Sequence, residues 1–118
     1  MHKFLAVFVL TTFLAIPLRA KRVTPAPVNP VVTTNTKYSA AGDGRRGYVL
    51  ASDLITGKEL WRAEIFHINI KPFLEEDVQW VFISDLKLSG KTLLVRDEKS
   101  RCYTVDLVTT HVQKSRCD

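Results

Sequence analysis

The nearest approach to a cluster of chemically active side chains lies in the middle of the chain, around His67. Three consecutive acids, Glu75, Glu76 and Asp77, begin eight residues after it. Carboxylates and imidazole are the groups that bind metals or exchange protons in proteins. The acids, however, share one predicted loop or helical turn after Pro72, whereas His67 belongs to a predicted strand. We therefore predict solvated loop acids here rather than metal ligands or an acid–base pair.

Other patterns for catalysis are incomplete. The Ser52-Asp53 and Ser84-Asp85 pairs lack the glycines that flank a nucleophilic serine. His111 falls in or beside a predicted hairpin turn, and Gly42-Asp43-Gly44 is too short for a phosphate-binding loop. The sequence thus predicts no catalytic residue, no cofactor site and no metal site, and the chain is not expected to be an enzyme.

The two cysteines, Cys102 and Cys117, point to a covalent cross-link. With His111 between them they supply only three zinc ligands, without the usual pair spacing of a structural site. An even number of cysteines in an exported chain favours a disulfide. We predict a Cys102–Cys117 bond.

Export is predicted from the N-terminus. Met1-His2-Lys3 is a short basic start, residues 4–16 are largely apolar, and Pro17 precedes a small residue, Ala20. This order is typical of a signal peptide, and the apolar run is shorter than the roughly 20 residues that span a bilayer. We assign residues 1–20 to a signal peptide. The mature chain is then expected in a periplasmic or extracellular compartment, with no membrane span.

The segment 21–46 has the composition of a linker. Pro25, Pro27 and Pro30 lie among threonines, alanines and glycines, and prolines remove backbone donors while glycines raise the entropy cost of ordering. We predict a Pro/Thr/Gly-rich linker and leave open a short strand around residues 31–34. The mature chain would carry a formal charge of +3, since Lys3 and Arg19 leave a chain of +5. Its charges form no basic run with interleaved aromatics, so no nucleic-acid partner is predicted.

From Gly47 onward the pattern predicts an all-β domain, residues 47–118. Apolar residues alternate within short runs, and each run is separated from the next by a turn sequence, which favours an antiparallel meander of five or six strands. The expected sheet is blade-like or partly rolled. The predicted strands are residues 48–54, 59–70, 78–88, 92–97, 101–107 and 112–116. Either a bulge or burial of both faces of the strand is expected at Ile65-Phe66, where the apolar phase switches.

The predicted core follows the apolar positions of these strands. Its members are Leu50, Leu54, Trp61, Ile65, Ile68, Trp80, Phe82, Leu86, Leu88, Leu93, Val95, Tyr103, Val105 and Leu107.

A short motif occurs twice. Asp53-Leu54-Ile55-Thr56 and Asp106-Leu107-Val108-Thr109 share Asp-Leu-x-Thr at a strand-to-turn junction, 53 positions apart. The first copy continues as Gly57-Lys58-Glu59-Leu60-Trp61 and resembles the repeat of PQQ-like β-propellers; the second has Thr110 in place of the glycine and no tryptophan. The resemblance covers residues 47–114 and implies about one and a half four-stranded blades. It implies no cofactor, because the quinone of the enzymatic members sits at the axis of a complete ring.

Two registers are open for the last hairpin. A turn at residues 108–111 places Cys102 opposite Cys117 and is the preferred register, since it suits the separation of about 5.5 Å between disulfide-bonded Cα atoms. A tighter turn at Val108-Thr109 places Cys102 opposite Ser115 and makes the disulfide diagonal.

These features favour a small exported, non-catalytic binding or structural module. Two contact surfaces are expected: the edge strands, which can pair with a protein partner or a second copy, and an aromatic face. The candidate aromatic residues are Trp61, Phe66, Trp80 and Phe82. The alternative is an extracytoplasmic inhibitor or small-ligand carrier, and a hydrolase ranks third.

Overall fold

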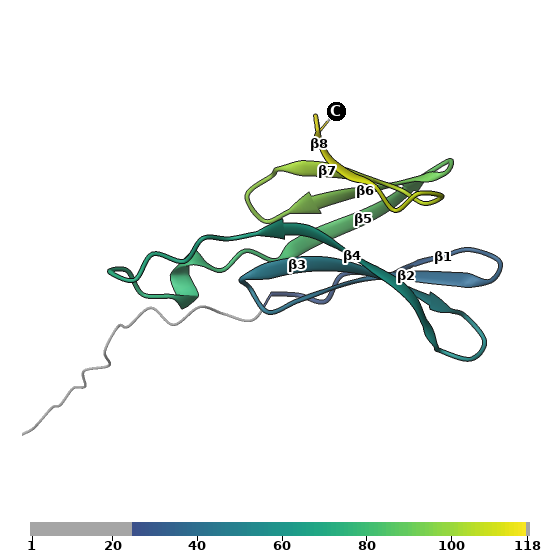
Figure 1. Ribbon diagram of the computed structural model, residues 1–118, viewed down its shortest axis with the longest axis horizontal. Helices are drawn as coiled ribbons and strands as arrows, with labels where there is room; N and C mark the ends of the chain where they lie inside the picture. The colour runs from purple at the N-terminus through teal and green to yellow at the C-terminus, as the bar shows by residue number, and fades with distance from the viewer. Residues whose placement is uncertain (1–24, 118) are drawn as a thin grey trace, which may run out of the picture.

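The chain folds into two four-stranded antiparallel sheets, described in a computed structural model over residues 25–117 (Figure 1). Sheet A contains β1 (Val31–Val32), β2 (Thr36–Gly42), β3 (Arg46–Asp53) and β4 (Glu59–His67). Sheet B contains β5 (Ile83–Ser89), β6 (Thr92–Asp97), β7 (Cys102–Asp106) and β8 (Val112–Ser115). In each sheet the strands pair in chain order. The prediction of an all-β antiparallel meander is confirmed, whereas the predicted signal peptide lies outside the described residues.

The repeated Asp-Leu-x-Thr motif builds the same turn in both sheets. The Asp53 carboxylate accepts hydrogen bonds from the backbone N–H groups of Ile55 and Thr56, each at 2.9 Å. The Asp106 carboxylate accepts from Val108 and Thr109, at 2.8 and 3.0 Å. Acceptance by an aspartate of amides two and three residues on fixes the turn locally. The β3–β4 and β7–β8 turns are therefore structural copies of each other.

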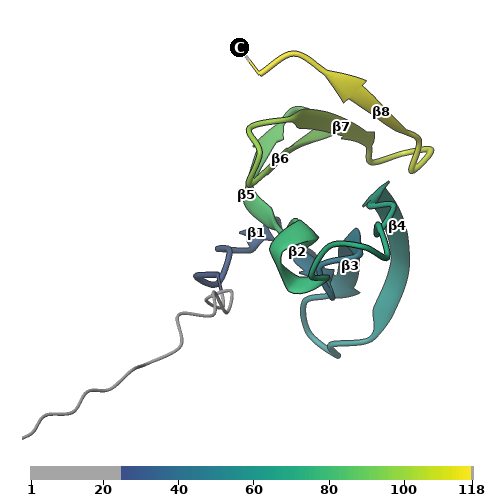
Figure 2. The same ribbon diagram turned by 90° about the vertical axis from the view of Figure 1, so that its left-hand side faces the viewer.

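The two sheets face each other and enclose the core between them. They contact along two seams, β1 and β2 with β5, and β4 with β8, so that the strands surround the core when viewed from one end (Figure 2). The core residues alternate along each strand, as the pleat requires. The core cluster consists of Tyr38, Val49, Ala51, Ile65, Ile83, Leu86, Leu93, Val95, Tyr103 and Val105.

The structure corrects the linker prediction for part of residues 21–46. β2 pairs with β3 along its whole length, from Thr36 opposite Asp53 to Gly42 opposite Gly47, and β1 pairs with β2. Tyr38 on β2 belongs to the core. Threonine, tyrosine and alanine suit a paired strand once a neighbour supplies the hydrogen bonds, and composition alone does not register that neighbour. With β1 and β2 included, the chain forms two blade-like sheets rather than one and a half.

Several core predictions are wrong because the wrong set of alternating residues was assigned to the core-facing side of the strand. On β3 the structure buries Val49 and Ala51, and leaves Leu50 half-buried on the opposite face. Leu54 and Leu88 are exposed, at 40% and 37%. Both residues of the Val49-Leu50 pair are apolar, so alternation did not decide which of them faces the core.

Bulges in β4 and β5 further change which residues of these strands face the core. Gly47 pairs with Phe66 and Tyr48 with Glu64, which leaves Ile65 as the extra residue and confirms the expected bulge in β4. A bulge at Leu60 of β4, where Ala51 pairs with Trp61 and Ser52 with Glu59, was not predicted. Nor was the bulge in β5 between Ile83 and Asp85. It lets Ile83 and Leu86 both face the core, so that the buried residues before it are Val81 and Ile83 rather than Trp80 and Phe82.

The last hairpin adopts the register that was not preferred. Cys102 pairs with Ser115 and Val105 with Val112. The disulfide forms nevertheless, with 5.3 Å between the Cα atoms of Cys102 and Cys117. β8 ends at Ser115, so the two residues after it lie beyond the ladder and bring Cys117 to Cys102.

Candidate functional site

The connection between the two sheets, residues 68–82, is the longest between neighbouring strands in the described chain. It joins β4 to β5 and contains a 3₁₀ turn, η1 (Asp77–Gln79). Hairpin loops have about 2–5 residues, and much longer ordered loops are usually functional. In Figure 1 this connection projects beyond the strands at one end of the molecule. Its length and its projection from the sheets make it the leading candidate for a contact surface.

The Gln79 side chain braces the connection from within. Its Oε1 accepts a 2.8 Å hydrogen bond from the backbone N–H of Lys71, and its Nε2 donates to the Lys71 carbonyl at 3.0 Å. The same amide nitrogen lies 3.4 Å from the carbonyl oxygen of Leu74 and 3.2 Å from that of Glu75. One side chain thus ties together backbone groups that the loop would otherwise leave without secondary-structure partners.

Glu76 anchors the connection to sheet A. Its carboxylate accepts two hydrogen bonds from the Arg45 guanidinium, one of them 2.7 Å from Nη2, and a third of 3.0 Å from Nε1 of Trp80. The Arg45 bonds, and next the Trp80 bond, lower the pKa of Glu76 to about 2. A bidentate Arg–carboxylate pair fixes orientation as well as charge.

Gly44 allows the Trp80 side chain to pack closely against the turn between β2 and β3. Its φ is +92°, and a Cβ built at this position would overlap the Trp80 side chain. The Gly44 carbonyl also accepts a 3.0 Å hydrogen bond from the Val81 backbone. The turn between β2 and β3 therefore needs a glycine both for its conformation and for the close approach of Trp80.

The braced connection holds apolar side chains in solvent. Phe73 is 78% exposed, and Leu74 and Val78 are each 49% exposed. An exposed phenylalanine on a rigid loop is the kind of group that anchors a protein interface, because little conformational entropy is lost when it binds. Sequence reasoning missed this group. The signal available was Pro72-Phe73-Leu74, an apolar pair next to a proline in a segment already predicted to be a loop.

The four predicted binding aromatics are half-buried and divide among three contacts. Trp61 packs against Tyr38 with 6.0 Å between ring centroids, and Phe66 packs against Tyr103 at 5.8 Å. Trp80 and Phe82 contact each other edge-to-face at 6.4 Å. The structure brings together only the last pair, which belongs to the base of the connection.

The polar residues considered as metal ligands or as an acid–base pair do not form a common site in the fold. Glu75 is exposed in the connection, Glu76 is bound to Arg45, and His67 ends β4. Within residues 25–117, no group of three or more His, Cys, Asp or Glu side chains is arranged to hold a metal ion. The Ser84 hydroxyl donates to the Arg96 carbonyl at 3.2 Å.

The sheet edges carry features that oppose pairing with another strand. β1 has two residues and β8 has four. β4 bears Glu59, Arg62 and Glu64, and the Arg62–Glu59 ion pair is 3.1 Å long. The fourth edge strand, β5, contains the bulge near Ile83. Short strands, charges and bulges are the usual means by which proteins protect an edge.

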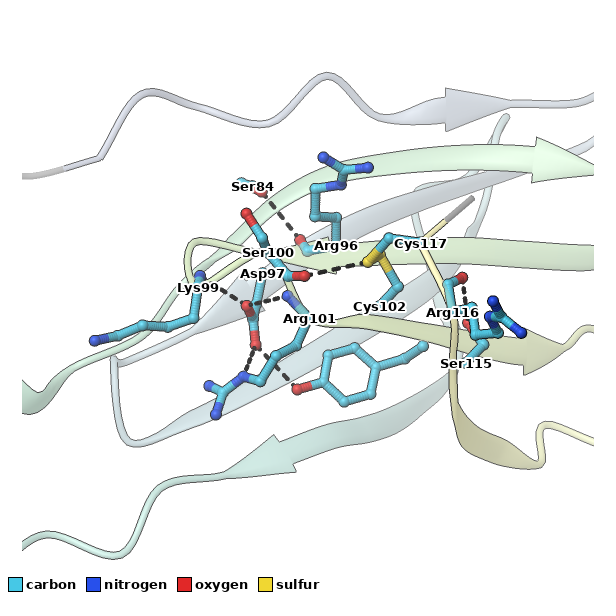
Figure 3. The surroundings of a disulfide bond; sticks show 11 residues. Ser84, Arg96, Asp97, Lys99, Ser100, Arg101, Cys102, Ser115, Arg116 and Cys117 are labelled. Carbon is cyan, nitrogen blue, oxygen red and sulfur yellow. Dashed lines mark hydrogen bonds and ion pairs between the residues drawn. A yellow bond between two sulfur atoms is a disulfide. The ribbon is translucent and has the colours of Figure 1, made fainter.

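A groove of about 280 Å³ lies on the face of sheet B that points away from the core, beside the disulfide. Two adjacent cross-strand rows form its floor: Lys87 with Leu94, and Asp85 with Arg96 and Cys102. Residues 116 and 117 form one rim, held in place by the Cys102–Cys117 bond (Figure 3). The Sγ atom of Cys117 lies 3.2 Å from the Ser100 carbonyl oxygen.

Among residues 25–117, no helix has the length and apolar character needed to cross a bilayer.

Comparison with known proteins gives a likeness of fold. No family model matches the chain, and no curated protein matches it in sequence. The fold is similar to the crystal structure of BamB from Moraxella catarrhalis, with a TM-score of 0.55 and 17% sequence identity. The match covers 84% of this chain and 28% of that one, so this chain spans less than a third of the BamB chain. BamB is a PQQ-like β-propeller protein, and the resemblance of this chain to propeller blades is confirmed at the level of fold.

Proposed function

We propose that this chain is an exported, non-catalytic protein-binding module built from two propeller-type blades, and that the connection 68–82 is its main contact surface. The observation that carries the proposal is the combination of Phe73 at 78% exposure with a loop braced by Gln79. Loops held by a rigid β scaffold are common binding sites. A connection that only joined two blades would gain nothing from an exposed phenylalanine.

Export is supported by two features. The N-terminal sequence has signal-peptide order, and the Cys102–Cys117 disulfide is of a kind that persists in oxidising compartments. Cell fractionation of the expressed full chain, with alkylation of free thiols before lysis, tests this point. A soluble cytoplasmic chain with two free thiols would contradict it.

The edges and the aromatic face rank below the connection as contact surfaces. The edge strands are short, charged or bulged, and three of the four candidate aromatics are occupied by contacts with Tyr38, Tyr103 or Glu76. A non-catalytic role agrees with the separation of the polar candidates described above.

Site-specific photo-crosslinking tests the proposed surface. A photoreactive phenylalanine analogue at position 73 should cross-link the chain to a discrete protein in its native host compartment. The matched control is the same analogue at Ile55, which is 88% exposed in the β3–β4 turn and lies outside the connection. Cross-linking at 55 but not at 73 would contradict the assignment.

The brace provides a second test. Gln79→Ala keeps Phe73 but removes the hydrogen bonds that order the connection. We expect weaker binding of the cross-linked partner through a faster dissociation rate, because ordering entropy must then be lost on binding. Phe73→Ser should abolish the cross-link partner's binding, and Ile55→Ser should leave it unchanged.

A further inference from the structure

The groove on sheet B and the connection 68–82 have complementary chemistry. The connection contains one lysine and three acids, and it exposes the apolar side chains of Phe73, Leu74 and Val78 next to the carboxylate of Glu75. Residues 83–117 contain seven Lys or Arg and four Asp or Glu, a formal charge of +3. The most acidic segment of the described fold is thus its most exposed apolar loop, and the most basic segment is the sheet that carries the groove.

The groove can accept an aromatic side chain, because it offers an apolar floor with charged side chains on both sides. Leu94, 36% exposed, provides an apolar floor. Lys87 lies opposite Leu94 on β5, and Arg96 lies two residues along β6 on the same face. A guanidinium beside an aromatic ring adds a cation–π contact to the apolar one. Asp85 pairs with Arg96 across the ladder, and its single negative charge leaves an excess of basic side chains along the groove.

The geometry points to this groove as the docking site for the connection of a second copy of the chain. Phe73 would lie on Leu94, and Glu75 would face Lys87 and Arg96. Within one chain the connection projects from one end, and β8, beside the groove, lies elsewhere in Figure 1. The contact is therefore between copies, with the connection of one chain in the groove of the other. The inference rests on the proposed function only in treating the connection as a contact surface.

Sedimentation velocity of the purified, disulfide-bonded chain tests the inference. Wild type should associate reversibly with concentration, and less so at high salt because exposed charge pairs are screened. Phe73→Ser removes the loop anchor and Arg96→Glu reverses a groove charge, and each should raise the dissociation constant at least about tenfold. Ile55→Ser and Lys58→Glu make the same chemical changes in the β3–β4 turn and should have no effect.

Mixing the two variants gives the sharpest result. The Phe73→Ser chain keeps an intact groove, and the Arg96→Glu chain keeps an intact connection. Each alone should be monomeric, whereas an equimolar mixture should form a one-to-one pair and nothing larger, since only one loop and one groove remain competent. All four variant positions are exposed, and circular dichroism of each variant verifies its fold. Lys87→Glu supplies a second groove variant in case Arg96→Glu fails to fold.

A labelled synthetic peptide of residues 71–77 measures the groove separately. It should bind wild type and Phe73→Ser equally, and Arg96→Glu about tenfold more weakly. A strictly monomeric wild type that does not bind the peptide would overturn the inference, as would association that neither variant changes. If position 73 still cross-links to a different protein, the proposed function stands without the self-docking. If it cross-links to nothing, both fall.

Discussion

Tyr103 donates its hydroxyl hydrogen to the carboxylate of Asp97 at 2.9 Å, inside the core between the sheets. Among the residues that the structure describes, Asp97 is the only buried charged side chain, at 1% exposure. The carboxylate also accepts from Nε of Arg101 and from the backbone N–H of Lys99, each at 2.8 Å (Figure 3). Burial alone would raise the pKa of Asp97, but these hydrogen bonds outweigh it and hold the pKa below its usual value. The β6–β7 turn is thus organised around one ionised, fully hydrogen-bonded carboxylate.

Replacing that carboxylate should be costly. Asp97→Asn removes the charge and one acceptor oxygen, and leaves the Arg101 or Tyr103 donor without its partner. We expect a loss of about 2–3 kcal/mol in the free energy of unfolding, the usual range for buried hydrogen bonds to a charged group. Urea denaturation measures it. Asp85→Asn, at an exposed position of sheet B, is the control and should change the value little. Equal losses for the two variants would contradict the central role of Asp97.

Stability should fall at alkaline pH through Tyr103. Burial, and next the hydrogen bond to Asp97, raises the pKa of Tyr103 to about 12. An unfolded tyrosine has a pKa near 10, so the folded chain holds this proton more tightly than the unfolded chain. The stabilisation is complete below about pH 10 and is lost as the pH rises from about 10 to about 12. The free energy of unfolding, measured against pH, should fall more steeply in wild type than in Tyr103→Phe. Parallel curves would show that Tyr103 does not carry the effect.

Replacing Thr110 with glycine should stabilise the fold. It occupies the turn position of Gly57 in the second hairpin, and its φ is +65° against +77° for the glycine. A β-branched residue in this region is strained by about 1–3 kcal/mol. Thr110→Gly should therefore raise the free energy of unfolding by about 1 kcal/mol, after the greater flexibility of glycine in the unfolded chain is included. The reciprocal change, Gly57→Thr, should lower it, although nothing lies within 4 Å of a Cβ built there. A Thr110→Gly variant no more stable than wild type would refute the strain argument.

Removing the disulfide should weaken the last hairpin. Cys102 and Cys117 close a loop with a sequence separation of 15 residues, for which the chain-entropy model predicts about 3 kcal/mol. The Cys102→Ser/Cys117→Ser double variant should lose up to that amount in guanidinium denaturation. It should also release residues 116–117 from the groove. Wild type in reductant should match the double variant. A double variant as stable as the oxidised wild type would show that the bond has no net stabilising role.

Strand positions after Gly47 could be predicted because turn chemistry is local. Asp53, Asp97 and Asp106 each bind amides two or more residues on, and such contacts are readable from adjacent letters. A strand forms at each of the six places expected after Gly47, but β4 ends at His67 rather than at residue 70 and β5 begins at Ile83 rather than at residue 78. The disulfide was also accessible to reasoning, since only two cysteines are present.

What escaped prediction depends on partners distant in the chain. β2 is a strand because β3 supplies its ladder, and no local signal in residues 36–42 reports that. The last register was misjudged because Cys117 was expected directly opposite Cys102, whereas β8 ends at Ser115 and Cys117 reaches Cys102 from beyond the ladder. Only the middle of the connection was read as a loop, and its two ends, residues 68–70 and 78–82, were wrongly read as strand. Gln79 and Arg45 order it through contacts with residues up to 31 positions away. The ordered connection holds Phe73 in solvent, and no local sequence pattern reports this.

Strict pairing in chain order has a consequence for how the molecule acquires its structure. Every ladder joins neighbouring strands, so each sheet has low contact order and needs no residue from the other sheet to form. Among the described strands, the contacts that join the two sheets are those of β1 and β2 with β5 and of β4 with β8. We expect sheet A to assemble hairpin by hairpin as a cooperative unit of its own, with sheet B following and the two closing on each other last. Hydrogen exchange pulsed during refolding would then protect the amides of β3 before those at the interface of β4 and β8.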